Sequence, residues 1–296
     1  MSTSERVRAG RAEILLLVCV LIWAANFPVA KYGIAGLDIF VFNSIRYLVA
    51  AASLMVLFLA RSTWKPVDRS DWSSIFRAGL VANVLYQLAF IIGLSMTTAG
   101  NSAVLLATAP LWTVFLNACM HKEKILLPLW LGMAFSLCGV AIIIIGSGKK
   151  LELGSNALAG DIITLAAAIL WALSTNLQKP LLTRYSPLQV TLMMIGVGAI
   201  GLSVVAIPPA AALAWGSIHF TYYLAAVASG TLSIAAANAF WSFGVKRLGP
   251  GRTATFGNLV PVLALVISYF ALHEEPAGIQ FVGSAVTILG VWLARR

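Results

Sequence analysis

Aromatic, amide and hydroxyl side chains recur at helical spacing inside long apolar runs of this sequence. Trp23 and Asn26 lie three residues apart, and Trp171, Thr175 and Gln178 follow one another at the i, i+4, i+7 spacing of one helix face. In hydrocarbon an amide without a partner is costly. Such a face therefore either pairs with another helix or lines a cavity, in which rings stack on a solute and amides hydrogen-bond to it. The pattern indicates binding of a small polar or aromatic molecule.

The candidate substrate-binding residues share this character and this placement within apolar spans. Each of them could instead hydrogen-bond across helices, at about 0.6 kcal/mol per contact, and many membrane Trp and Tyr residues are interfacial anchors. Because they gather on shared helix faces in both halves of the chain, the set favours a cavity. It comprises Trp23, Asn26, Asn83, Tyr86, Gln87, Trp112, Trp171, Thr175, Gln178, Asn238, Trp241 and Asn258.

Three cations in or beside apolar spans are the candidate gating and charged residues. Arg46 lies several residues inside the second span, where ionisable groups are rare and usually functional. Asp38 or a carboxylate of the substrate could pair with it. Lys31 and Lys179 end spans, where they either snorkel to the interface as anchors or contribute to a gate.

The sequence offers no constellation for catalysis. His121, His219 and His273 lie at span ends without metal-ligand spacing, and no nucleophile is grouped with an acid and a base. We therefore expect no catalytic residues, no metal site and no cofactor. The formal net charge is +10, but the cations form no basic face, so nucleic acid is not an expected partner.

Composition places these residues in a membrane. Of the 296 residues, 60% are hydrophobic and 10% are charged, against roughly 25% charged residues in soluble domains. Ten apolar windows are long enough to cross a bilayer as helices of about 20 residues. We therefore predict an all-α integral membrane protein with ten transmembrane helices, whose windows are 14–34, 38–60, 72–94, 100–119, 125–146, 157–178, 187–207, 219–243, 252–272 and 276–294.

The positions of the basic residues predict the orientation of these helices. When successive loops are assigned alternately to the two sides, fifteen Lys and Arg residues fall on one side and three, Lys31, Lys149 and Lys150, on the other. Since cytoplasmic loops carry an excess of cations, both termini are predicted to be cytoplasmic, in a multi-pass protein of the inner (plasma) membrane.

The sequence contains an internal repeat, because residues of the first half recur in the second half at a nearly constant offset. Trp23 and Lys31 recur as Trp171 and Lys179 at an offset of 148 positions. Five helices in each half make the second half start from the opposite face, so we predict two inverted repeats, residues 1–150 and 151–296. Such architecture is typical of secondary transporters. A second set recurs at an offset of 151: Gly93 and Gly244, Gly100 and Gly251, Pro110 and Pro261, Glu123 and Glu274, Gly132 and Gly283, Gly139 and Gly290.

These repeated residues resemble a known family. Each half opens on an acid, a Trp ten positions later and a Lys eight beyond it, and each ends on Pro110 or Pro261 thirteen residues before a glutamate. This pattern is similar to the EamA repeat of the drug/metabolite transporter superfamily, and the resemblance covers the whole chain. It implies a ten-helix exporter of small metabolites. The aromatic set resembles that of YddG-type aromatic amino acid exporters. The counterpart of Arg46 in the second half is Met194, so no symmetric role is implied there.

The expected function is export of a small metabolite by alternating access through a central cavity at the repeat interface, most plausibly of aromatic or bulky apolar amino acids. Two alternatives stay open: a carrier of nucleotide sugars or other phosphate esters, and a multidrug or organic-cation efflux protein. The expected partners are the small-molecule substrate and the lipid bilayer, and we expect a monomer.

Overall fold

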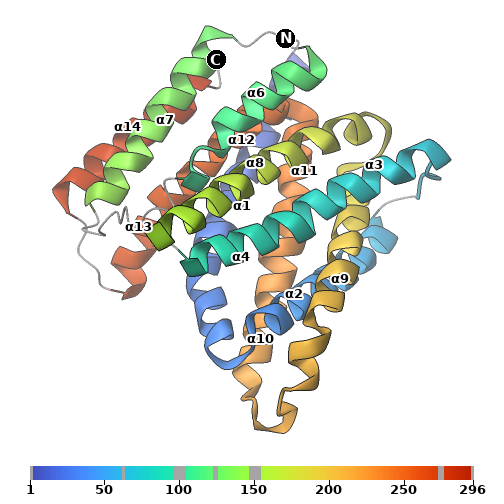
Figure 1. The fold of residues 1–296 in the computed structure, drawn as a ribbon. Helices are drawn as coiled ribbons and strands as arrows, with labels where there is room; N and C mark the ends of the chain where they lie inside the picture. Colours follow the sequence, from blue (N-terminus) through green and yellow to red (C-terminus); the bar gives the residue numbers. More distant parts are fainter. Residues whose placement is uncertain are drawn as a thin grey trace. The chain divides into compact units, whose positions relative to one another are not determined.

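The computed structural model describes residues 3–61, 64–96, 105–122, 126–146, 155–272 and 277–294, and within these ranges it is helical, with no strand (Figure 1). Apart from end residues and two breaks, each of the ten predicted windows is helical wherever it is described. The helices are α1 (Thr3–Gly36), α2 (Ile39–Arg61), α3 (Arg69–Leu80), η1 (Val81–Leu85), α4 (Tyr86–Met96), α6 (Ala109–His121), α7 (Leu127–Gly146), α8 (Ser155–Arg184), α9 (Pro187–Ala211), η2 (Trp215–Ser217), α10 (Phe220–Ser229), η3 (Gly230–Ala236), α11 (Ala237–Leu248), α12 (Pro250–Gly257), α13 (Leu259–Leu272) and α14 (Gly278–Ala294).

The chain forms two compact units. Unit 1 comprises Met1–Val84 and Pro180–Arg247, and unit 2 comprises Leu85–Lys179 and Leu248–Arg296. Each unit therefore combines segments from both halves of the sequence. The two repeats of the sequence therefore do not coincide with the two units of the fold.

Seven helical segments among the described residues are long and apolar enough to cross a bilayer by themselves. The fourth and ninth windows are not among them because each is interrupted, at residues 107–108 and at Asn258. The last apolar helix, α14, has 17 residues. Large apolar side chains such as Val56 (68% exposed) and Ile200 (72% exposed) point outward from the helices, which fits a surround of hydrocarbon rather than water.

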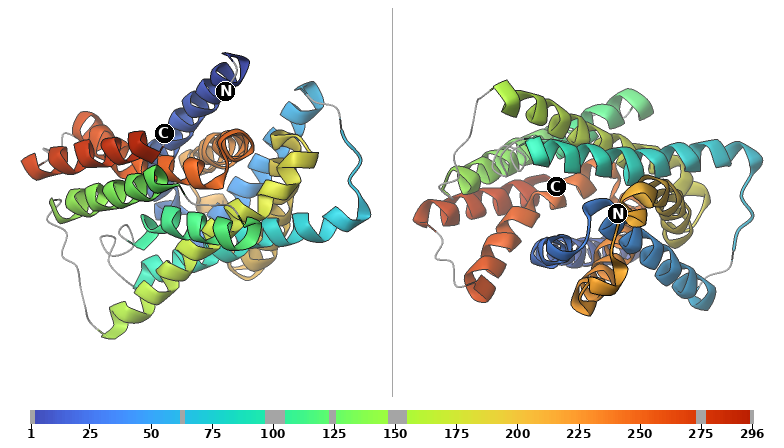
Figure 2. Two further views of the ribbon diagram at one scale, coloured as in Figure 1. Left: turned by 90° about the horizontal axis from the view of Figure 1, so that it is seen from above. Right: turned by 60° about the horizontal axis from the view of Figure 1, so that its bottom comes forward.

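In unit 2, α7 and α14 pack along their length and lie side by side in both views of Figure 2. Gly132 lies against Gly290, and Gly139 against Gly283: a Cβ atom added to Gly132 would lie 2.6 Å from the Gly290 carbonyl oxygen, and one added to Gly283 would lie 2.7 Å from that of Gly139. Small residues permit this approach of two backbones. Because the lower number on one helix meets the higher on the other, the two helices are antiparallel. They are the fifth and tenth windows, so equivalent helices of the two halves run in opposite directions, as inverted repeats require.

Backbone irregularities also repeat between the halves. The helix that spans the third window contains the π-helical segment η1. When the residue numbers of η1 are raised by the repeat offset of 151, they fall within the π-helical segment η3. The break at 107–108, which precedes α6, corresponds to the break at Asn258, which precedes α13. The internal repeat seen in the sequence is thus a repeat of structure.

Three prolines within the predicted windows, Pro28, Pro110 and Pro261, do not break the helices that contain them. α1 continues through Pro28, since a proline removes only one backbone hydrogen bond and a helix with many others can tolerate it. Pro110 and Pro261 lie in the first turns of α6 and α13, where the missing N–H has no intrahelical acceptor in any case. The interruptions of regular helix are instead the π segments η1 and η3 and the breaks before α6 and α13.

Candidate functional site

In unit 1, the π-helical segment η3 is the centre of a group of polar and aromatic residues. The Trp23 ring of α1 lies against the Trp241 ring of α11, with centroids 5.2 Å apart and planes at 43°. Trp23 Nε1 donates a hydrogen bond of 3.1 Å to the Ser233 carbonyl oxygen. A π-helical turn disturbs the regular i→i−4 bonds and recurs at functional sites. The two predicted tryptophans are therefore brought together beside a backbone carbonyl that accepts a side-chain bond.

Two predicted amides join the same segment. Asn238 Nδ2 donates to the Ile234 carbonyl oxygen at 2.8 Å, and Asn26 Oδ1 accepts a hydrogen bond from the Ser229 hydroxyl. Ser229 ends α10, next to η3. We call these residues, with Arg46, the η3 cluster: Trp23, Asn26, Arg46, Ser229, Ser233, Asn238 and Trp241.

Arg46 enters this cluster through backbone packing of α2 on η3. A Cβ atom added to Gly230 would lie 2.5 Å from the Arg46 carbonyl oxygen, so only glycine permits the approach. The Arg46 side chain is buried, its guanidinium carbon lies 5.4 Å from the centre of the Phe42 ring, and its Nη1 donates to Asn43 Oδ1 at 2.8 Å. A charged group is thus held inside a membrane helix by a neutral amide and a ring.

Asn83, also in unit 1, is occupied by protein groups. Its Nδ2 donates to the Met194 carbonyl oxygen at 2.9 Å and its Oδ1 accepts from the Tyr47 hydroxyl at 3.3 Å. These contacts join η1, α2 and α9. They are the helix-to-helix contacts that the sequence left open as an alternative for each amide.

Unit 2 contains a second aromatic pair. The Trp171 and Tyr86 rings have centroids 5.1 Å apart with planes at 46°, and Phe90 stacks on Tyr86 at 6.1 Å. Thr175 Oγ1 donates to the Trp171 carbonyl oxygen at 3.0 Å. Gln178 is buried in the same unit and Gln87 is half-buried. Since Trp171 is the repeat equivalent of Trp23, in each unit the tryptophan of one half contacts an aromatic residue from the third helix of the other half.

The other predicted residues of unit 2 lie near the two helix breaks or at the end of the unit. Trp112 Nε1 donates to Thr108 Oγ1 at 3.2 Å, immediately before α6. Asn258, at the break before α13, donates from Nδ2 to Ser136 Oγ at 2.9 Å. Lys179 Nζ donates to Asn117 Oδ1 at 3.2 Å.

Sequence reasoning missed Asn176, which is fully buried in unit 2. Its Nδ2 donates to the carbonyl oxygens of Thr113 (3.0 Å) and Ala172 (2.9 Å), while its Oδ1 is buried without a hydrogen-bond partner. It lies five residues after Trp171, off the i, i+4, i+7 face. A search for every amide side chain within an apolar span, rather than for polar residues that share one helix face, would have found it.

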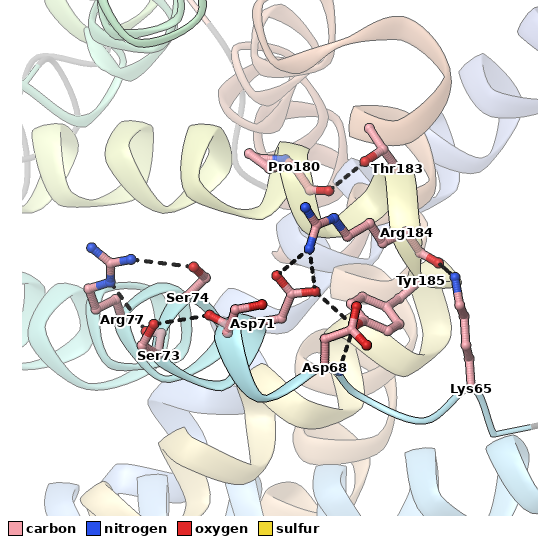
Figure 3. A network of polar contacts seen from close by, with 11 residues as sticks. Lys65, Asp68, Asp71, Ser73, Ser74, Arg77, Pro180, Thr183, Arg184 and Tyr185 are labelled. Carbon is pink, nitrogen blue, oxygen red and sulfur yellow. Dashed lines mark hydrogen bonds and ion pairs between the residues drawn. The ribbon is translucent and has the colours of Figure 1, made fainter.

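Sequence reasoning also missed a charged network at one end of unit 1 (Figure 3). Arg184 Nη1 donates to both Asp71 carboxylate oxygens, at 2.8 and 2.9 Å, and the Tyr185 hydroxyl donates to Asp71 Oδ2 at 2.8 Å. Lys65 Nζ donates to the Arg184 carbonyl oxygen and Lys246 Nζ to that of Tyr185, both at 2.9 Å. These contacts tie α3 and the segment before it to the end of α8, and they tie Tyr185, which follows α8, to α3 and α11.

The Tyr185 hydroxyl takes part in this network as a donor. The hydrogen bond that it accepts from the Asp68 backbone N–H lowers its pKa, but burial and the bond to the Asp71 carboxylate raise the pKa by more, so the net shift is upward. The phenol is therefore protonated at neutral pH and available to donate to Asp71.

Two other expectations concern Lys31, as a candidate gating residue, and the histidines, for which no metal site is expected. The backbone of Lys31 belongs to α1, but its side chain is outside the described part of the structure, as is the whole of His273. Among the described residues, no three His, Cys, Asp or Glu side chains are grouped as metal ligands would be.

Comparison with known proteins gives one family for the whole chain. The model of the EamA-like transporter family matches residues 10–145 and 158–296, one match in each half.

Relatives extend over the same length. The chain is 29% identical over 294 residues to a probable terminal-alkyne amino-acid exporter of Streptantibioticus cattleyicolor, covering 98% of this chain and 95% of that protein. It is 27% identical over 290 residues to the uncharacterised transporter YyaM of Bacillus subtilis, covering 95% and 92%. A solved crystal structure superposes with a TM-score of 0.79 at 18% identity, covering 96% of this chain and 98% of the other. That last likeness concerns the fold alone.

Proposed function

Because the chain belongs to the EamA-like transporter family, and is therefore a multi-pass membrane transporter rather than an enzyme, we propose that it exports amino acids with aromatic or bulky apolar side chains. The full-length similarity to a probable terminal-alkyne amino-acid exporter supports amino acids as the class of substrate.

The observation that carries the proposal is the η3 cluster. Two indole rings 5.2 Å apart offer faces on which a flat or bulky apolar side chain can stack. Amide oxygens and the carbonyl groups of a π-helical turn are acceptors suited to an ammonium group. An amino acid presents both kinds of group within a few ångströms. The pair formed by Trp171 and Tyr86 supplies a second aromatic surface, in unit 2.

The charges within the helices favour a zwitterion over the alternative substrates. Arg46 is the single buried cation among the described residues, whereas a phosphate ester calls for several convergent cations. Asp71 is the single buried acid in the described part of the chain, and it already binds Arg184. An organic cation would need a buried carboxylate as its counter-charge. Neither a nucleotide-sugar carrier nor an organic-cation pump fits this inventory as well as an amino-acid exporter.

The proposed transport mechanism is alternating access. The inverted relation of α7 and α14 supports it, since two inverted repeats related by a pseudo-twofold axis in the membrane plane can exchange an arrangement open to one side for one open to the other. We place the protein as a monomer in the inner membrane, with both termini in the cytoplasm. That orientation is supported by the basic residues in alternate loops.

The test is transport by the purified protein in liposomes. Vesicles loaded with one unlabelled compound are mixed with the labelled form, and counterflow uptake is measured for phenylalanine, leucine, alanine, a nucleotide sugar and tetraphenylphosphonium. The proposal expects counterflow of phenylalanine and leucine above that of empty liposomes and above that of alanine. Counterflow of the nucleotide sugar or the organic cation alone would replace it by the corresponding alternative.

A further inference from the structure

Arg46 is a buried cation whose protein environment does not neutralise it. It lies in the eighth position of α2, with 8% of its surface exposed. An ionisable group at such a depth in a membrane helix normally pairs with another group or serves a solute pathway.

An inventory of the guanidinium nitrogens shows that most of its hydrogen-bonding capacity is unused. Nη1 donates to Asn43 Oδ1 at 2.8 Å. Nε is buried and has no hydrogen-bond partner, and no bond from Nη2 is present either. The Phe42 ring at 5.4 Å contributes a cation–π contact and no acceptor atom. A guanidinium offers five N–H donors in a planar fork, so a single neutral amide leaves most of these donors without an acceptor.

The sequence left Asp38 as one possible counter-ion, and the structure assigns that carboxylate another role. Asp38 Oδ1 accepts hydrogen bonds from the backbone N–H groups of Phe40 (2.9 Å) and Val41 (3.2 Å) at the start of α2. It caps the helix, about 12 Å along the axis from Arg46 at 1.5 Å per residue. Within the described residues Arg46 therefore has no anionic partner.

We propose that Arg46 is a carboxylate subsite: the edge of its guanidinium that lacks a protein acceptor, Nε and Nη2, binds the carboxylate of the transported molecule. This inference rests on the proposed export of amino acids and deepens it, because it makes a free carboxylate a requirement for recognition. Two parallel N–H groups on one edge of a guanidinium match the two oxygens of a carboxylate, and such bidentate pairs are among the strong charge-assisted contacts.

The surroundings of Arg46 suit a subsite better than a structural ion pair. Asn43 holds one nitrogen, and it is itself held by the bond from its Nδ2 to the Ile39 carbonyl oxygen at 3.0 Å. The fork is thus oriented without being neutralised. The backbone of Arg46 packs directly on Gly230, the first residue of η3, so the subsite adjoins the segment that carries the Trp23 contact.

The first experiment needs no variant. Stabilisation of the purified protein against thermal unfolding and inhibition of counterflow are measured with phenylalanine, phenylalaninamide, phenethylamine and 3-phenylpropionate. The inference expects phenylalanine to act at a concentration at least about tenfold lower than the amide or the amine, since a charge-assisted bidentate contact is lost with the carboxylate. Equal potency of phenylalanine and its amide would overturn it.

The second experiment changes the subsite. Asn43→Asp places a carboxylate beside Nη1, which neutralises the guanidinium from within, and Arg46→Gln removes it. Both variants are expected to lose the preference for phenylalanine over the amide, and Arg46→Lys to keep part of it. Arg77→Gln is the matched control, because Arg77 lies on α3, is exposed and bonds only within its own helix, to Ser73 and Ser74. It is expected to keep the full preference.

The outcomes separate this inference from the proposed function. If the protein transports phenylalanine and folded Asn43→Asp and Arg46→Gln proteins keep the parental preference, the carboxylate subsite is wrong while amino-acid export stands. If no amino acid is transported but 3-phenylpropionate stabilises the parent and not Arg46→Gln, the subsite stands and the proposed substrate is wrong. If the variants do not fold, the ligand comparison on the parent protein decides.

Discussion

The contact between α7 and α14 predicts that a single methyl group is destabilising at Gly290. A Cβ atom there would lie 2.3 Å from the Ser136 backbone nitrogen and 2.6 Å from the Gly132 carbonyl oxygen. Ordinary contacts at such an atom are about 3.4 Å or longer, so the two helices would have to separate by about 1 Å, a gap that forfeits a quarter to a half of the dispersion energy of the atoms affected. Both obstacles are backbone atoms, which cannot rotate away.

The magnitude follows from two opposing terms. Overpacking a close interface costs about 1–3 kcal/mol, and a backbone clash belongs at the upper end of that range. Replacement of glycine by alanine within a helix returns about 1 kcal/mol through propensity. Gly290→Ala should therefore destabilise by about 2 kcal/mol, which corresponds to a melting temperature roughly 4–8 °C lower, at about 2–4 °C per kcal/mol.

The assay is thermal unfolding of the purified protein in detergent, followed by loss of the monodisperse peak. Gly196→Ala is the matched control, because Gly196 lies inside α9 and a Cβ atom there would meet nothing within 4 Å. That variant should melt at or above the parental temperature. If Gly290→Ala melts as high as Gly196→Ala, the close antiparallel packing of α7 on α14 is not present in the protein.

Three further predictions concern the aromatic pair of unit 2, the charged network and the orientation. Trp171→Ala should weaken phenylalanine counterflow roughly tenfold, because the ring contact with the substrate and the filling of the space are both lost, whereas Trp171→Phe retains much of the activity; parental rates in a normally inserted Trp171→Ala protein would make this ring a packing residue. Asp71→Asn should lower the melting temperature, and by more than Tyr185→Phe, since it weakens the acceptor of both Arg184 and Tyr185; an unchanged melting temperature would mean that the network does not hold the helix ends together. A cysteine at residue 212 should react with an impermeant maleimide added outside intact cells, and one at residue 66 should not; the reverse labelling would invert the proposed orientation.

The sequence predicts the membrane class, the helical windows and the repeat because these depend on local or periodic information. A bilayer of nearly constant thickness sets the length of each apolar run, and recurrence of residues such as Trp23 and Trp171 at a constant offset can be read without knowing any contact. The polar helix faces are predicted for the same reason, since the helical period alone places Trp171, Thr175 and Gln178 in one row.

Only the tertiary structure decides how each polar residue is used. Asn26 and Asn83 look alike in sequence, yet Asn26 meets Ser229 beside η3 while Asn83 is bonded to Met194 and Tyr47. Asp38 could be a counter-ion or a helix cap, and the geometry at the start of α2 makes it a cap. Asp71 and Arg184 lie 113 positions apart. Such partners depend on how distant helices pack against one another, which the period of a single helix does not encode.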